Sequence, residues 1–495
     1  MKYPNLQRRG FLLPNRLQNS YEGGSSSGSR TRNWQPSASG PNSIAAYQLP
    51  TLRRRSNDAV RNDPWAKTAV NKHVVNAIGT GVQPYPQHPD KKVRTILKEW
   101  WNDWVLESDA DGRQDFYGQQ SLAARHIFKD GEALARLRMR RPEDGLSVPL
   151  QIQMLAPAHL PAEKNEHLPN GEIVNGVEFD LIGRRKNYHL WTRHPGEGVQ
   201  GMAKVQETRP VPADQIIHAY TILDAGQVRG VPELSTVLMR LKSLDNFDDA
   251  VLFRQEVSNL FAGFVTKQSP SAQGLDPVTG QPATYDSDGS PLVSLEPGTM
   301  QELLPGEEVQ FSSPPDAGQN YEAFMRQQLL AAFASVGIPY EIATGDIRNI
   351  SDRALRVVVN EFHRAIEQFQ WNTFIHQFCR PVWAAWTDAV ALSGVIPMPD
   401  YFKNRRLYQR VRWVPQGWPY FNPVQDIKAK KDQRRAGLIS RRGIILAQGD
   451  DPDEVEREIL EEDKFADDNG LVFDTDARKT TANGANSKQE LDDQD

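Results

Sequence analysis

Residues 231–265 read VPELSTVLMRLKSLDNFDDAVLFRQEVSNLFAGFV and predict one long helix. Pro232 stands at its start, where the missing N–H is not needed, and apolar residues recur through it at Leu234, Leu238, Leu241, Leu244, Val251, Leu252 and Leu260. A second helix is predicted at 321–336, YEAFMRQQLLAAFASV, which ends before Gly337 and Pro339. Between them, 267–299 is rich in Pro, Gly, Asp and Ser and predicts a loop, with short strands near 292–295 and 308–311. Two helices joined by an irregular segment therefore predict a helical hairpin.

Before this hairpin the pattern changes from helix to strand near residue 132. Helices are predicted at 52–61, 64–78 and 121–128. Residues 92–107, KVRTILKEWWNDWVLE, predict an amphipathic helix, because apolar residues recur three and four positions apart. Over 132–220, short apolar runs separated by Pro, Gly and Asn clusters predict an antiparallel β region.

Helices return after the hairpin. TGDIRNIS, residues 344–351, predicts a loop, and Ser351 is placed to cap a helix that runs through residue 378 and breaks at Pro381. A helix over 382–392, a polar and aromatic stretch at 398–421, a helix from Asn422 to Gly437 and two further short helices follow. The fold class predicted is α+β and mainly helical.

Charge is segregated along the chain, although the net charge is only −5. Residues 1–62 carry ten Lys/Arg against two acids, 428–442 carry seven against one, and 450–468 carry eleven Asp/Glu against two Lys/Arg. A chain that grips DNA normally has a basic balance, so any contact with DNA is expected to be loose. Residues 1–48 lack apolar periodicity and predict a disordered arm, and 469–495 predict a polar, acidic tail.

No catalytic, cofactor or metal site is expected. The sequence contains no GxxxxGK[ST], GxGxxG or HExxH motif, and a single cysteine, Cys379, rules out an intrachain disulfide and fits a reducing compartment. The stretch 24–28 satisfies GxSxG, but its flanks are of low complexity rather than strand and helix. No signal peptide or membrane-spanning run is recognisable, so export and membrane insertion are not expected.

The tryptophans and the first arginine cluster allow two interpretations. Helical spacing places Trp100, Trp101 and Trp104 in the core. Trp413 and Trp418 lie among arginines, a mixture that suits nucleic acid or a protein interface, and an interface is the preferred interpretation. The run 53–55, three arginines, is expected to serve subunit contacts or solvent rather than DNA.

An ordered series of short motifs resembles the lambda-type portal proteins of tailed phages, over roughly residues 50–465. The series comprises AVRNDPWAKTAVNKHVVNAIGTG at 59–81, KEWWNDW at 98–104, KDGEAL at 129–134, IIHAYTILDAGQVRGVPELS at 216–235, LLPGEEVQF at 303–311, FASVGIPYEIATGD at 333–346 and NEFHRAIEQFQ at 360–370. The fourth is the most characteristic, and its signature positions are His218, Gln227, Arg229, Gly230 and Pro232.

The resemblance implies a portal fold of wing, stem, clip and crown, and a ring, expected to be a dodecamer. Laid on this sequence it implies a wing at 49–231, stem helices at 232–261 and 313–340, a clip at 262–312, a tunnel loop at 341–353, a supporting helix and its successors at 354–421 and a crown at 422–468. Within the tunnel loop, Asp346, Arg348 and Asn349 would face the channel. Asp346 and Arg348 would touch phosphates transiently, or form only a capped, solvated loop. Ring neighbours would complete the burial of the stem hairpin.

The resemblance also implies partners and a location. Double-stranded DNA would pass through the channel, and the terminase large subunit, the capsid and scaffold proteins and a head–tail adaptor would bind the ring, at one vertex of a virion assembled in the host cytoplasm. Two alternatives stay open: another ring-forming head–neck component, and a packaging enzyme, which the missing phosphate loop argues against.

Overall fold

The computed structural model describes residues 33, 36–197, 207–260, 264–267, 307–310, 321–348, 350–418, 422–473, 476 and 478–479. The predicted loop at 267–299 beyond Lys267, with its strand at 292–295, most of the predicted arm at 1–48 and most of the predicted tail at 469–495 lie outside these residues. Within the described part of the chain, no helix combines the length and apolar character needed to cross a lipid bilayer.

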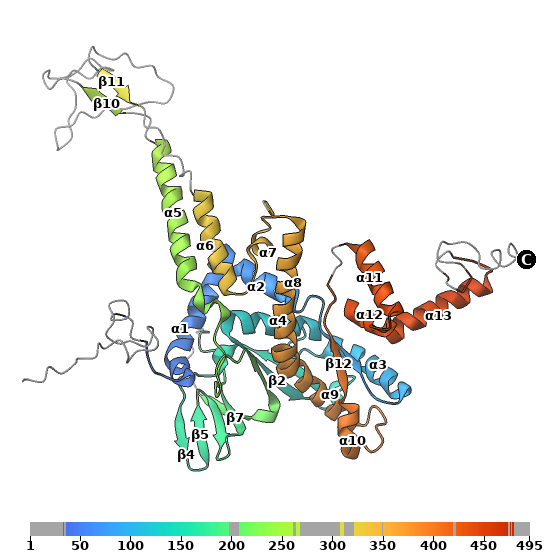
Figure 1. Cartoon of the computed structure of the whole chain (residues 1–495). Helices are drawn as coiled ribbons and strands as arrows, with labels where there is room; N and C mark the ends of the chain where they lie inside the picture. The colour runs from blue at the N-terminus through green and yellow to red at the C-terminus, as the bar shows by residue number, and fades with distance from the viewer. Residues whose placement is uncertain are drawn as a thin grey trace, which may run out of the picture.

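The body of the molecule is built on a three-stranded antiparallel sheet with helices against it (Figure 1). The sheet has the order β3–β2–β9, with β2 at Glu132–Met139, β3 at Leu150–Leu155 and β9 at Ile216–Tyr220. The helices that precede it are α1 (Pro41–Asn62), α2 (Pro64–Ala77), α3 (Lys91–Glu107) and α4 (Phe116–Asp130). Short 3₁₀ turns lie at Pro142–Asp144, Pro157–His159, Ala213–Gln215 and Glu233–Thr236.

A cluster of aromatic side chains fills the core of this body. The predicted amphipathic helix is confirmed as α3, and Trp101 and Trp104 are buried on it. Trp383, Trp386 and Trp413 pack around Trp101, with ring centroids 5.0–6.4 Å from it. Trp413 is only 2% exposed, so its preferred interpretation as an interface residue was wrong.

The predicted antiparallel β region is confirmed, and it continues into a second sheet. This sheet is a five-stranded meander in chain order. Its strands are β4 (Glu166–Leu168), β5 (Gly171–Val174), β6 (Val177–Asp180), β7 (Arg185–Trp191) and β8 (Thr208–Pro212). Val177, Tyr188, Leu190 and Val211 form a separate small core with Leu134 of β2, which joins the two sheets.

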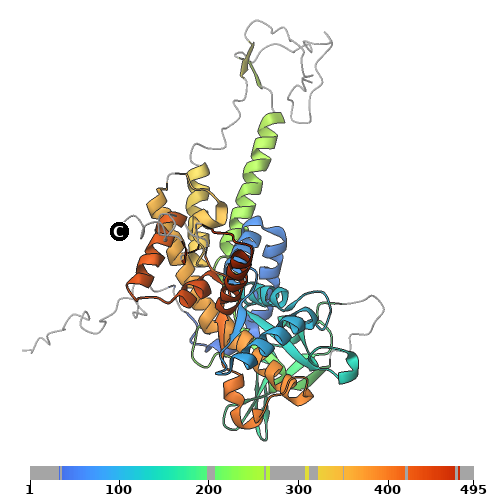
Figure 2. The ribbon, with the colours of Figure 1, turned by 90° about the vertical axis from the view of Figure 1, so that its right-hand side faces the viewer.

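The predicted hairpin is a pair of helices that projects from the body (Figures 1 and 2). Its helices are α5 (Leu238–Leu260) and α6 (Tyr321–Ser335), and strands β10 (Phe264–Lys267) and β11 (Glu307–Gln310) pair antiparallel beyond α5. Tyr321 donates a hydrogen bond of 2.7 Å to Asp248, and the rings of Phe247 and Phe324 lie 5.1 Å apart. These contacts hold the two helices side by side.

After α6 the chain forms α7 (Tyr340–Thr344), α8 (Asp352–Gln368), a π-helix (Phe369–Cys379) and α9 (Arg380–Ser393). Ser351 caps α8 as predicted, because its hydroxyl accepts the N–H of Ala354. The predicted break at Pro381 was wrong. The N–H of Arg380 bonds to the carbonyl of Ile375, five residues earlier. The wider π turn displaces the carbonyl that a proline ring would meet in an α-helix, so the helix continues.

The last helices stand beside the body (Figure 1). The chain passes through α10 (Tyr401–Tyr408) and β12 (Val411–Val414), which pairs with β1 (Gln83–Pro86), and then forms α11 (Pro423–Arg435), α12 (Arg441–Gln448) and α13 (Pro452–Asp468). Lys98 of α3 forms ion pairs with Asp451 and Glu454, and Tyr85 of β1 bonds to Asp453. Polar contacts therefore attach this three-helix unit to the body.

Helix α1 begins at Pro41, so the prediction of a disordered arm up to residue 48 was wrong for 41–48. The sequence there lacks an apolar repeat, but the segment is held by tertiary contacts. Asn42 bonds to the carbonyl of Gly226 and accepts the N–H of Val228, and Leu49 is completely buried. Packing against the rest of the chain overrides the weak local signal.

Candidate functional site

The loop between α7 and α8 holds the residues predicted to face a channel. Asp346 and Arg348 form an ion pair with Nε and Oδ1 2.8 Å apart. Arg348 also lies 2.9 Å from Glu322 of α6, and Arg326 of α6 lies 4.0 Å from Asp346. The loop is thereby attached to the projecting helix pair. Asn349 lies outside the described residues.

Electrostatics make this loop nearly neutral. The hydrogen bond from the Arg348 side chain lowers the pKa of Asp346 to about 2. Asp346 is therefore ionised at any physiological pH and balances the charge of Arg348, whose side chain is 67% exposed. A loop of this kind offers a phosphate one exposed guanidinium that is already paired, which favours brief contact over tight binding.

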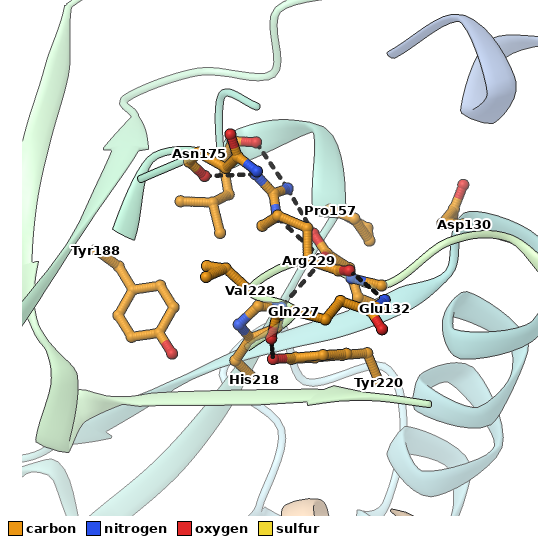
Figure 3. Close-up of polar contacts among 12 residues, drawn as sticks. Asp130, Glu132, Pro157, Asn175, Tyr188, His218, Tyr220, Gln227, Val228 and Arg229 are labelled. Carbon is orange, nitrogen blue, oxygen red and sulfur yellow. Dashed lines mark hydrogen bonds and ion pairs between the residues drawn. The ribbon is translucent and has the colours of Figure 1, made fainter. Parts of the chain in front are cut away.

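The signature residues come together elsewhere, in a buried cluster around Glu132 at the start of β2 (Figure 3). Arg229 donates from Nε to both carboxylate oxygens at 3.0 Å and from Nη2 to one of them at 2.5 Å. The guanidinium of Arg53 lies 2.7 Å from the same carboxylate, Nε2 of His218 lies 3.1 Å from it, and Gly230 donates its N–H to it at 3.0 Å. The carboxylate thus joins α1, β2, β9 and the chain before α5.

Gln227 shapes the loop that brings Arg229 to this carboxylate. Its side-chain oxygen accepts the N–H groups of Leu223 and Asp224, and its amide donates to the carbonyl of Arg229. Tyr220 donates its hydroxyl hydrogen to the carbonyl of Gln227 at 2.8 Å (Figure 3). The loop is therefore closed by side-chain bonds to its own backbone.

Two glycines allow the backbones to approach each other at the cluster. A Cβ on Gly230 would lie 2.0 Å from the carbonyl oxygen of Gly131, and one on Gly131 would lie 2.6 Å from the nitrogen of Pro232. Gly131 also has a φ of 90°, which favours glycine. The signature positions Gly230 and Pro232 thus allow the chain to run close to the end of α4.

The cluster keeps its charges without any exposure to solvent. Burial alone would raise the pKa of Glu132, but Arg229 and Arg53 beside it hold that pKa well below the usual range. Burial lowers the pKa of His218 to about 4, so this histidine is neutral at physiological pH. One carboxylate held between two guanidinium groups is strongly anchored, and its role is to hold elements together rather than to exchange protons.

The sequence interpretation missed both Glu132 and Arg53. Arg53 was expected at a subunit contact or in solvent, and that prediction was wrong, because its side chain is buried against Glu132 and the carbonyl of Asp130. The available signal was an acid at the head of an apolar strand, EALARL, which requires a buried partner. Trp418, the other uncertain tryptophan, stacks on His363 with ring centroids 3.6 Å apart.

The described residues offer neither a metal-binding group nor a reactive thiol. None of their His, Cys, Asp and Glu side chains form a group of three or more that is able to hold a metal ion. Cys379 is buried, and burial raises the pKa of its thiol well above the ordinary value, so it is not a reactive thiolate.

Comparison with known proteins gives one consistent result. Residues 27–370 match the family described as phage portal protein, lambda family. A probable portal protein of Halomonas phage phiHAP-1 is 24% identical over 83% of this chain and 80% of its own length. Portal protein B of Escherichia phage lambda is 20% identical over 88% of this chain and 87% of its own length. The neck of a gene transfer agent particle aligns at 14% identity and a TM-score of 0.45, over 82% of this chain and 94% of that one.

The family match and the curated relatives place the chain in the class of phage portal proteins. The match spans more than half of the sequence, and the chain belongs to the lambda family of phage portal proteins. The resemblance drawn from the sequence motifs, and the portal function it implied, are confirmed.

Proposed function

We propose that the chain assembles into a closed ring of twelve copies whose axial channel passes double-stranded DNA during packaging and ejection. The observation that carries this proposal is the apolar surface of the projecting helices. Leu241 and Leu244 of α5 are buried against the body, whereas Leu252, further along the same helical face, is 62% exposed and Phe253 is 67% exposed. A helix with apolar residues on several sides is stable when neighbours cover it.

In this proposal α5 and α6 form the stem, residues 262–312 the clip, 341–353 the tunnel loop, 422–468 the crown and 49–231 the wing. Asp346 and Arg348 line the channel, where the paired charges let DNA slide. The terminase large subunit binds the clip, and a head–tail adaptor and the capsid and scaffold proteins contact the ring at one virion vertex. The chain itself carries out no catalysis, and a partner hydrolyses ATP; the absence of a phosphate-loop motif supports this division.

Assembly is tested by native mass spectrometry with negative-stain imaging of the wild-type chain and of Leu252→Asp/Phe253→Asp. We expect wild-type rings of twelve times the 55.8 kDa chain mass, and folded monomers from the variant. Leu181→Asp/Ile182→Asp, in the exposed turn between β6 and β7, is the matched control and should leave rings intact. A wild-type monomer with ATPase or nuclease activity would refute the proposal.

The channel role of the loop is tested by Arg348→Glu in assembled particles. We expect altered DNA retention, because a loop with two carboxylates repels phosphates in the channel. Arg364→Glu on α8 makes the same charge change at an exposed ion pair outside the loop and should retain DNA as the wild type does. Equal behaviour of the two variants would remove Arg348 from the channel.

A further inference from the structure

Helix α11 has no buried residue, whereas the helices that follow it, α12 and α13, contain buried residues. Val424, Lys428, Lys431 and Arg435 recur at spacings of four, three and four residues and therefore share one helical face. This basic face is exposed along its whole length. Lys428, Lys431 and Arg435 form no ion pair with any residue in the described ranges. Within residues 422–435 only Asn422, Asp426 and Lys430 are half-buried, so the described chain covers little of this helix, and packing against a partner would stabilise it.

Helix α13 presents a face of the opposite charge. Glu458, Glu461, Phe465 and Asp468 recur at spacings of three, four and three residues, so they also lie on one side, and all four are exposed. Phe465 is 62% exposed at the centre of this acidic face, and Val424 is 78% exposed at one end of the basic face. Each face thus combines a large apolar side chain with three charges of one sign.

We propose that the basic face of α11 in one copy of this chain packs against the acidic face of α13 in the next copy around the ring. This pairing rests on the ring assembly proposed above. In a closed ring every copy contributes two different surfaces, one to each neighbour, so a basic face and an acidic face on one chain satisfy all junctions. Complementary charge selects the partner, and Val424 and Phe465 lose exposed apolar area.

The test uses charge reversal on each face, with Lys428→Glu/Lys431→Glu on α11 and Glu458→Lys/Glu461→Lys on α13. The measurement is amide hydrogen exchange of peptides from α11 and α13 in purified rings. We expect either variant alone to exchange about tenfold faster in α11 than the wild type, because attractive pairs become repulsive. Lys403→Glu/Arg406→Glu on α10 makes the same charge change at exposed positions and should leave α11 exchange unchanged.

Mixed rings distinguish pairing between copies from pairing within one copy. Rings that alternate the two variants place each reversed α11 beside a reversed α13, and each wild-type α11 beside a wild-type α13. We expect protection of α11 to return in rings co-assembled from both variants and purified through two different tags. Protection restored only when all four substitutions are in one chain would place the pairing within the chain and overturn the inference.

Two further results would also overturn the inference. The first is α11 exchanging as fast in wild-type rings as in the Leu252→Asp/Phe253→Asp monomer. The second is protection of α11 that arises only when double-stranded DNA is added, which would assign the basic face to DNA. Either result leaves rings intact, and with them the proposed function. A wild-type chain that forms no ring would remove the proposed function and the pairing together.

Discussion

Replacing Glu132 with glutamine removes a negative charge from the buried cluster. Among the described contacts of the cluster, this is the only negative charge that touches the two buried guanidinium groups. Removing one partner of a buried ion pair costs about 3–5 kcal/mol, because the other charge stays buried without compensation. Arg229 keeps hydrogen bonds to the carbonyls of Asn175 and Leu160, and Arg53 keeps one to the carbonyl of Asp130. The loss of unfolding free energy is therefore expected near the lower end of that range, at about 3 kcal/mol. This is a large part of the 5–15 kcal/mol of unfolding free energy that is typical of folded domains.

The assay is urea unfolding followed by tryptophan fluorescence, since Trp101 and its neighbours report on the core of the body. The measurement belongs in the monomeric Leu252→Asp/Phe253→Asp background, because assembly would make stability depend on concentration. Glu454→Gln is the matched control: its carboxylate is 46% exposed and pairs with Lys98, so it should cost less than about 1 kcal/mol.

The pH dependence gives an independent check on the cause. The folded-state pKa of Glu132 lies well below the ordinary 4.5, so its stabilisation is fully present above pH 4.5 and is lost as the pH falls through the lower folded value. The difference in free energy of unfolding between Glu132→Gln and the wild type should therefore be the same at pH 7 and pH 5. It should shrink only in stronger acid. A Glu132→Gln protein within about 1 kcal/mol of wild type at pH 7 would refute the reasoning.

Three more predictions follow from the same geometry. Gly230→Ala should lower the free energy of unfolding, measured in urea, by at least about 2 kcal/mol, because the new Cβ would lie 2.0 Å from the carbonyl oxygen of Gly131. A variant as stable as the wild type would contradict that close approach. His218 has a folded pKa of about 4, so its contribution to the free energy of unfolding is present above pH 6.5 and declines as the pH falls toward 4. His218→Gln should therefore make the free energy of unfolding depend less on pH between 6.5 and 4. An unchanged pH dependence would contradict this prediction. Asp346→Asn should leave the melting temperature of the monomer unchanged while removing one of the two carboxylates that pair with Arg348, and a clear drop in that temperature would show that the loop supports the fold.

The elements that could be predicted from sequence are those whose signal is local. The tryptophan helix, the helices α5 and α6 and the cap at Ser351 each follow from periodicity or from one side chain beside a helix start. The β region was predicted from turn residues, although its division into two sheets was not. Nothing local specifies which strands pair across a loop, because that choice is made by packing between segments far apart in the chain.

The missed features depend on contacts over long sequence distances. Arg53 stands in a run of three arginines that reads as exposed, and only the fold brings it to Glu132, 79 positions away in the printed sequence. Trp413 lies among arginines, yet β12 carries it into the core through pairing with β1. In both cases the charges near a residue in sequence were taken as a guide to its surroundings, but helix α1 turns Arg53 toward the body and strand β12 turns Trp413 toward the core.

The distribution of charge supports one account of the molecule. Glu132 pairs with Arg229 and Arg53 inside the body and holds four segments, and Asp346 pairs with Arg348 in the loop between α7 and α8. Exposed basic residues without an ion pair to the described residues lie on α11, at Lys428, Lys431 and Arg435, whereas α13 carries exposed acids, some of which pair within the chain, as Glu461 does with Arg457. In the proposed ring, charge pairing between neighbouring copies would stabilise the assembly, whereas an unpaired basic channel wall would bind phosphates with a strong dependence on salt and would slow the DNA. A weakly acidic chain with segregated charge is therefore better suited to passing DNA than to holding it.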